Sequence, residues 1–248
     1  MVDNSGNGPT RAPSTQVANN PYGAFEKPSK AVENFLLEVN RYQNVAPISG
    51  KGHLIFALDA TASREQTWDM ACQLQAEMFR EAASTGTLNI KLAYYRGIAE
   101  CRVSRSVSRS DELLRLMQCI RCEGGQTQIG RILDLAVKEA THPPGIGALV
   151  FVGDAMEENP DELIHKADEL GRLGVPAFMF QEGNTPNVEQ VFRVIAKRAK
   201  GAYCRFDTGA AKQLGELLRA VAAFVTGGLA ALSARKDAKS IKLLTQMK

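Results

Sequence analysis

Hydrophobic residues along the chain follow two patterns: short apolar runs, and longer segments with apolar residues at helical spacing. The clearest run is LIFAL, residues 54–58, which leads directly into Asp59. An uninterrupted aliphatic run of this length is typical of a strand buried on both faces of a parallel sheet. A second run, IGALVFVGD over residues 146–154, also ends in an acid. The two runs predict two central strands, each with a carboxylate at its carboxyl end.

The other segments alternate between strand and helix. Residues 88–95 alternate apolar and polar positions, and only a short link separates them from a strand expected at 100–105. So short a link permits a hairpin and not a helical crossover, which makes the second of these strands antiparallel. Two further strands are expected at residues 175–181 and 201–206, and helices at 64–83, 111–121, 160–173, 187–200 and 211–232, with another ending near 138.

This alternation predicts an α/β fold of three layers. We expect a Rossmann-like, mostly parallel, six-stranded sheet with one antiparallel edge strand and helices on both faces. Arg102 and Arg105 lie on that edge strand, where charged side chains commonly protect the edge from pairing with other chains.

Composition changes at both ends of the chain. Residues 1–28 are rich in Asn, Ser, Gly and Pro, which indicates a disordered arm. The domain is expected over residues 29–232, with its core at 50–230 and an amphipathic helix at its start. Residues 233–248 form a basic tail with five Lys or Arg and one acid. The tail is either a docking segment for an acidic partner or nucleic acid, or a solvated helix end.

Outside that tail, 25 basic and 26 acidic residues nearly cancel, so no broad nucleic-acid footprint is expected. The chain has 248 residues, 44% of them hydrophobic, and no apolar run approaches the length of a membrane span. Its N-terminus lacks the basic start and hydrophobic segment of a secretory signal. Five cysteines, an odd number, indicate reduced thiols, and we expect a cytoplasmic protein.

Two of these cysteines, Cys119 and Cys122, form a CIRC pair that could be redox-active or half of a zinc site. Zinc would lack further ligands, because there is no second pair and the three histidines are scattered. The simpler interpretation makes Cys119 a buried helix residue, with Cys122 near the helix end.

Candidate chemistry begins with DATAS, where Asp59 ends the first central strand. Thr61 and Ser63 alternate with alanines, so both hydroxyls can point the same way beside the acid. Ligands bind at this end of strands in open α/β sheets, and clustered oxygens suit a small cation such as Mg²⁺. Alternatively, Asp59 is the N-cap of the following helix. The loop at residues 123–130 lacks the Walker and GxGxxG spacings of phosphate-binding loops.

DATAS, GGQT (124–127) and VGD (152–154) stand in an order that resembles the von Willebrand factor A (vWA) family. That family carries a metal-ion-dependent adhesion site, written DxSxS, then a Thr, then an Asp. The antiparallel edge strand matches as well, and the resemblance covers residues 50–230. The chain is similar to bacterial vWA domains that stand alone.

The resemblance implies that hydroxyl oxygens and waters hold a Mg²⁺ ion, with Mn²⁺ or Ca²⁺ as alternatives. The metal residues would be Asp59, Thr61, Ser63, Thr127 and Asp154. The three hydroxyls would bind directly and the two acids largely through water. A partner's Asp or Glu would then complete the shell. Thr61 replaces the first Ser of the motif, which keeps the hydroxyl and stiffens the side chain.

The function this implies is a non-enzymatic, Mg²⁺-dependent protein-interaction module or adaptor. Its partner would be a protein that presents Asp or Glu, with AAA-type ATPases and kinase or phosphatase modules as candidates, and neither a membrane nor nucleic acid. One alternative is a metal-assisted phosphatase with Asp59 as nucleophile, although Thr61 stands where such enzymes commonly have a second acid. Another is a vWA scaffold with a degenerate metal site.

Overall fold

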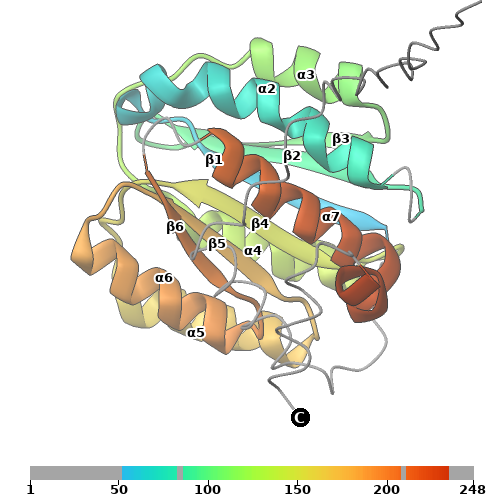
Figure 1. The fold of residues 1–248 in the computed structure, drawn as a ribbon. Helices are drawn as coiled ribbons and strands as arrows, with labels where there is room; N and C mark the ends of the chain where they lie inside the picture. The colour runs from blue at the N-terminus through green and yellow to red at the C-terminus, as the bar shows by residue number, and fades with distance from the viewer. Residues whose placement is uncertain (1–51, 83–85, 208–210, 235–248) are drawn as a thin grey trace, which may run out of the picture.

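The computed structural model describes residues 52–82, 86–207 and 211–234 of the 248. Its centre is a six-stranded sheet in the order β3-β2-β1-β4-β5-β6 (Figure 1). The strands are β1 (His53–Asp59), β2 (Asn89–Arg96), β3 (Glu100–Val107), β4 (Ala148–Gly153), β5 (Ala177–Glu182) and β6 (Tyr203–Phe206). All neighbours are parallel except β2 and β3. The predicted mostly parallel sheet with one antiparallel edge strand is confirmed.

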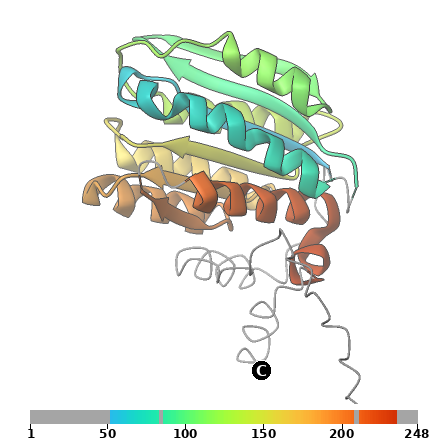
Figure 2. The same cartoon turned by 45° about the horizontal axis from the view of Figure 1, so that its top comes forward.

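Helices cover both faces of this sheet, which gives the predicted three layers (Figures 1 and 2). One face carries α2 (Glu65–Ala82), α3 (Ser110–Gln118) and α7 (Ala211–Ala234). The other carries α4 (Ile129–Thr141), α5 (Pro160–Arg172) and α6 (Pro186–Arg198). A short 3₁₀ helix, η1 (Ala62–Arg64), leads into α2.

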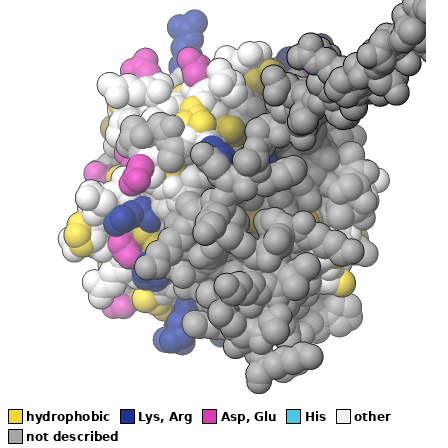
Figure 3. Space-filling view, viewed as in Figure 1, with side chains coloured by type: hydrophobic (Ala, Val, Ile, Leu, Met, Phe, Trp, Pro, Cys, Tyr) yellow, Lys and Arg dark blue, Asp and Glu magenta, His cyan; other side chains and the backbone are white. Residues whose placement is uncertain are grey.

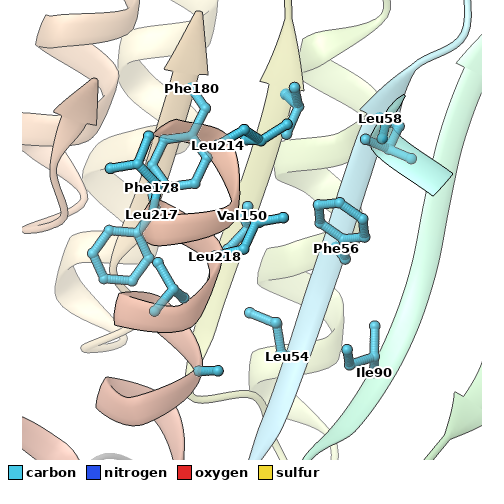
Figure 4. Close-up of a cluster of buried hydrophobic side chains, with 14 of the residues drawn as sticks. Leu54, Phe56, Leu58, Ile90, Val150, Phe178, Phe180, Leu214, Leu217 and Leu218 are labelled. Atoms are coloured by element: carbon cyan, nitrogen blue, oxygen red, sulfur yellow. The ribbon is translucent and has the colours of Figure 1, made fainter. Parts of the chain in front are cut away.

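The apolar run of β1 is continuous because the strand is buried on both faces. Leu54, Phe56 and Leu58 point into the cluster beneath α2, α3 and α7. Figure 4 shows these side chains on the same side of the sheet as the leucines of α7. Ile55 and Ala57 belong to the opposite cluster, beneath α4, α5 and α6. The period-two alternation of a strand therefore divides one apolar run between two cores.

The carboxyl edge of the sheet contains a topological switch point. From β1 the chain crosses to β2 on one side, and β4 pairs with β1 on the other. Ligands bind at such a switch point in open α/β sheets. Asp59 closes β1, and Asp154 follows β4 directly. The fold thus brings the two predicted carboxylates to this edge of the sheet.

Several predictions fall partly or wholly outside the described residues. The disordered arm at residues 1–28 and the helix expected after it lie outside, as does nearly all of the basic tail. The described end of the tail belongs to α7, which changes direction at Gly228, whose φ is 68°. None of the described helices combines the length and apolar character needed to cross a bilayer. On the described part of the surface in Figure 3, basic and acidic side chains are interspersed.

Candidate functional site

The loop after β1 forms the first part of the site. Asp59 is fully buried, and its Oδ1 accepts a hydrogen bond of 2.8 Å from the backbone N–H of Thr61. Its Oδ2 accepts one of 2.9 Å from the hydroxyl of Tyr95 on β2. The alternative that Asp59 caps the following helix is wrong, because the N-cap of η1 is Thr61 and α2 begins at Glu65.

Thr61 and Ser63 point their hydroxyls at one another, with the two oxygens 3.1 Å apart. Two ligands at right angles around Mg²⁺, each at about 2.0 to 2.1 Å, lie about 2.9 Å from one another. The observed separation therefore fits two adjacent corners of an octahedron. Thr61 is buried and Ser63 is exposed, so such a cation would sit at the boundary with solvent.

The electrostatics at the end of β1 disfavour excess negative charge. Burial raises the pKa of Asp59, the hydrogen bonds from Thr61 and Tyr95 oppose this rise, and the charge of Asp154 adds to it. Burial and the neighbouring Asp59 raise the pKa of Tyr95 well above its usual value, so its hydroxyl remains a donor. A cation at this edge would offset the mutual repulsion of the two acids.

Asp154 differs from Asp59 because one of its oxygens is unsatisfied. Its Oδ1 is buried and has no hydrogen-bond partner among the described residues. Gly153, at the end of β4, lies close to Asp59. A Cβ added to Gly153 would lie 2.8 Å from the Phe151 ring and 3.4 Å from the Cβ of Asp59. A buried acceptor without a donor costs free energy. A cation or its bound water would remove that cost, so the residues present fit a metal ion.

Thr127 is held by the loop that follows β4. Its backbone N–H donates to Oε2 of Glu157 at 3.1 Å, and the N–H of Glu157 donates to the Thr127 hydroxyl at 2.9 Å. Glu158 accepts from the backbone N–H groups of Ile129 and Gly130, at 2.6 and 2.8 Å, which satisfies the start of α4. The Thr127 hydroxyl oxygen has a second lone pair, so a cation could still bind it.

The segment before α4 is fixed on its other side by backbone contacts. Gly97, in the β2–β3 turn, donates to the carbonyl of Glu123 and accepts from the N–H of Gln126, at 3.4 and 3.1 Å. Glu123 also donates to the carbonyl of Ala60 at 3.0 Å, which joins this segment to the loop after β1. A Cβ on Gly125 would lie 1.9 Å from the Gly97 oxygen, so glycine is required there.

Together these contacts connect the three segments that carry the predicted metal residues. Asp59, Thr61 and Ser63 are joined directly by hydrogen bonds, and Asp154 lies close enough to shift the pKa of Asp59. Thr127 is linked to the loop after Asp154. Within the described ranges, no three His, Cys, Asp or Glu side chains are grouped to hold a metal ion. A cation here would depend on hydroxyl oxygens and water.

Four residues around the site were missed by the sequence reasoning. They are Arg64, Tyr95, Glu157 and Glu158, which contact or adjoin the predicted residues. A pair of acids shortly after Asp154 was a usable signal, since acids suit a helix N-terminus. Arg64 gave no such signal, because a charged residue at a helix start is normally expected in solvent.

The interpretation of Cys119 as a buried helix residue is wrong. Cys119 is exposed at the C-cap of α3, because that helix ends at Gln118, earlier than predicted. None of the five cysteines, all of which lie in the described ranges, forms a disulfide. Burial raises the pKa of the half-buried Cys122 to about 11. Its reactive thiolate is therefore scarce at neutral pH, which does not favour a redox role for the pair.

Comparison with known proteins bears on the fold. No family model matches the sequence, and neither does any curated protein. Among solved structures, BatB from Bacteroides thetaiotaomicron matches with a TM-score of 0.53 and 17% identity, over 69% of this chain and 98% of that one. The SpRpn10 VWA domain matches at 0.54 and 13%, over 68% and 94%.

A von Willebrand factor type A protein from Catenulispora acidiphila matches with a TM-score of 0.57 and 17% identity, over 72% of this chain and 43% of that one. The chain therefore has a vWA-like fold, as the resemblance of its motifs implies. At these identities the likeness concerns the fold alone, and the role of the site must be argued from its own residues.

Proposed function

We propose that this protein is a non-enzymatic, Mg²⁺-dependent interaction module that binds an Asp or Glu side chain of a partner protein. The binding edge lies where β1 and β4 end. A vWA-like fold supports the general role in protein interaction. The observation that carries the metal-dependent part is the pair of hydroxyls 3.1 Å apart beside a buried Asp154 oxygen that no described residue satisfies.

The roles of the residues follow from their chemistry. Thr61, Ser63 and Thr127 would supply neutral hydroxyl oxygens, while Asp59 and Asp154 would hold bound waters. Asp59 suits this indirect role, because its two oxygens already accept hydrogen bonds within the protein. When bound, the cation would supply an electrophilic position that accepts a carboxylate oxygen. Exposure of Ser63 gives a partner access to this position.

A phosphatase with Asp59 as nucleophile finds no support in this geometry. The Asp59 side chain is fully buried, and each oxygen is engaged by a donor of the protein. An attacking carboxylate oxygen must be able to reach the substrate. The degenerate-site alternative is decided by the metal titration described below.

The partner and the compartment belong to the same proposal. Five cysteines without a disulfide fit a reducing compartment, and we place the protein in the cytoplasm on that basis. The partner is a protein that presents Asp or Glu, and AAA-type ATPases and kinase or phosphatase modules are the candidates to screen.

The experiment is a Mg²⁺ titration followed by calorimetry and by chemical unfolding. Wild type should bind Mg²⁺ and gain about 2.7 kcal/mol of stability at a free concentration 100 times its Kd. Asp154→Asn should lose this gain. Asp134→Asn, which removes an exposed acid paired with Lys166, is the matched control and should keep it. The proposal fails if wild type does not respond to Mg²⁺, or if Asp154→Asn responds as wild type does.

A further inference from the structure

Arg64 is a fully buried charged side chain directly beside the candidate metal site. It follows Ser63 at the end of η1, and its exposed fraction is 0%. An ion taken out of water carries a large free-energy penalty unless it is well paired. Such a residue at the start of a surface helix therefore needs an explanation beyond packing.

The partner of Arg64 comes from β5. Glu182, the last residue of β5, is 5% exposed and forms an ion pair with the Arg64 guanidinium. Glu182 also accepts a hydrogen bond of 3.0 Å from the Thr67 hydroxyl. Its other oxygen has no hydrogen-bond partner among the described residues, and the same holds for the three guanidinium nitrogens. The pair is therefore incompletely satisfied by its own contacts.

The candidate metal residues supply the remaining electrostatic support for Arg64. Burial lowers the pKa of Arg64, and the negative charges of Asp154 and then Asp59 oppose that effect. The guanidinium thus interacts with the same two acids that would hold a cation through water. A second positive charge at that position must repel an incoming metal ion.

The formal charges show how Arg64 changes the net charge of the site. With all groups ionised, Asp59, Asp154, Glu182 and Arg64 carry a formal charge of about −2 together. A bound Mg²⁺ brings the sum over these four groups and the ion to zero. Without the arginine the same sum would be about −1, which would repel a carboxylate.

We propose that the buried Arg64–Glu182 pair sets the charge of the metal site, so that the site holds free Mg²⁺ weakly and accepts a partner's carboxylate without repulsion. This inference rests on the proposed function, because it concerns the same site. Arg64 acts through the field it produces at the site and contacts neither metal nor partner. Glu182 reduces the positive potential of Arg64 at the site, because its negative charge is paired with the guanidinium.

The test is a charge series measured with Mg²⁺ alone. Arg64→Met removes the repelling charge and should tighten Mg²⁺ binding roughly tenfold in calorimetry. Glu182→Gln removes the ion-pair partner of Arg64 and should weaken Mg²⁺ binding by a similar factor. The double variant restores the net charge and should return to within about threefold of wild type, while Arg64→Lys should stay near wild type. Loss of packing alone would weaken binding in every variant, so tightening in Arg64→Met is the diagnostic result.

The second arm titrates acetate into the Mg²⁺-saturated proteins, followed by NMR. Arg64→Met should bind acetate severalfold more weakly than wild type, and Glu182→Gln more tightly. If Arg64→Met does not fold, Glu182→Gln is compared with the double variant, which differs only at position 64 and should bind Mg²⁺ about tenfold more tightly.

The outcomes separate this inference from the proposed function. If wild type and the folded charge variants bind Mg²⁺ with the same affinity, the role of Arg64 is overturned and the proposed function stands. If Arg64→Met binds Mg²⁺ and wild type does not, the proposed function is overturned and the role of Arg64 is supported. Absence of binding in both overturns both.

Discussion

The carboxyl ends of β1 and β4 look alike in sequence and differ in structure. Each strand is a buried apolar run followed by an acid at the same edge of the sheet. Asp59 is fully buried, with both carboxylate oxygens bonded to donors of the protein. Asp154 is half-buried, and its Oδ1 has no such donor within the described part of the chain.

This difference indicates that the two acids perform different tasks. Asp59 organises its own loop and links β1 to β2 through Tyr95, so its two carboxylate oxygens are used as acceptors within the fold. Asp154 contributes little to its loop, which is held by the neighbouring Glu157 and Glu158. Asp59 therefore supports the structure of the site, and Asp154 is the acid available to a ligand.

The largest expected effect comes from removing each acid in turn. Asp59→Ala leaves two buried donors without an acceptor and should lower the free energy of unfolding by about 3 kcal/mol. Asp154→Ala, measured without metal, should change it by less than about 1 kcal/mol, because a poorly satisfied buried oxygen is lost. Urea denaturation followed by circular dichroism measures both.

A control for this pair is Asp59→Asn, which keeps the shape and one acceptor and should cost less than Asp59→Ala. Equal losses for Asp59→Ala and Asp154→Ala would show that the two acids do not differ as described.

The next effect concerns the close approach of the two strand ends. Gly153→Ala places a Cβ 2.8 Å from the Phe151 ring. The overpacking should cost about 2 kcal/mol in urea denaturation. Gly174→Ala serves as the comparison, because an added Cβ there meets nothing within 4 Å and the positive φ of 74° is its only penalty. A neutral Gly153→Ala would mean that the Phe151 ring can move aside to accommodate the added Cβ.

A smaller effect is expected from the acid that anchors α4. Glu158→Ala removes the acceptor of two backbone N–H groups at the start of the helix and should cost about 1 kcal/mol. It should also weaken Mg²⁺ binding, because the position of the Thr127 loop depends on this contact. Glu162→Ala, at an exposed position of the next helix, should leave Mg²⁺ affinity unchanged. Identical Mg²⁺ affinity in both variants would contradict the positioning role.

The smallest effect is a pH dependence carried by Asp59. Its pKa is raised in the folded protein, first by burial, above the ordinary value of 3.8. For a raised carboxyl pKa, the contribution to stability is present below the unfolded value and is lost as pH rises through the folded value. The stability of wild type relative to Asp59→Asn should therefore fall between pH 4 and neutrality, in urea denaturation without metal. If the stability of wild type relative to Asp59→Asn stays constant or rises with pH, the fold does not disfavour the charged form of Asp59.

Much of this fold follows from local pattern. The runs that became β1 and β4 were recognisable because a strand buried on both faces leaves no polar positions. The hairpin of β2 and β3 followed from the shortness of its link. The proximity of the Thr61 and Ser63 hydroxyls followed from their alternation with alanines.

Other features depend on contacts between residues far apart in sequence. Arg64 is buried in an ion pair with Glu182 from β5, and nothing near position 64 signals that pairing. The same is true of Glu157, whose role appears only when the loop after β4 meets Thr127. Cys119 was misplaced because the end of α3 depends on the fold rather than on the apolar period.

The close approach of Gly97 and Gly125 fixes the distance between the β2–β3 turn and the segment before α4. Backbone touches backbone there, with no side chain between to compress or rotate. The tip of the β2–β3 turn carries Ile98, whose side chain is 81% exposed. Because the turn and the segment before α4 are joined backbone to backbone, Ile98 is held in a fixed position relative to Thr127.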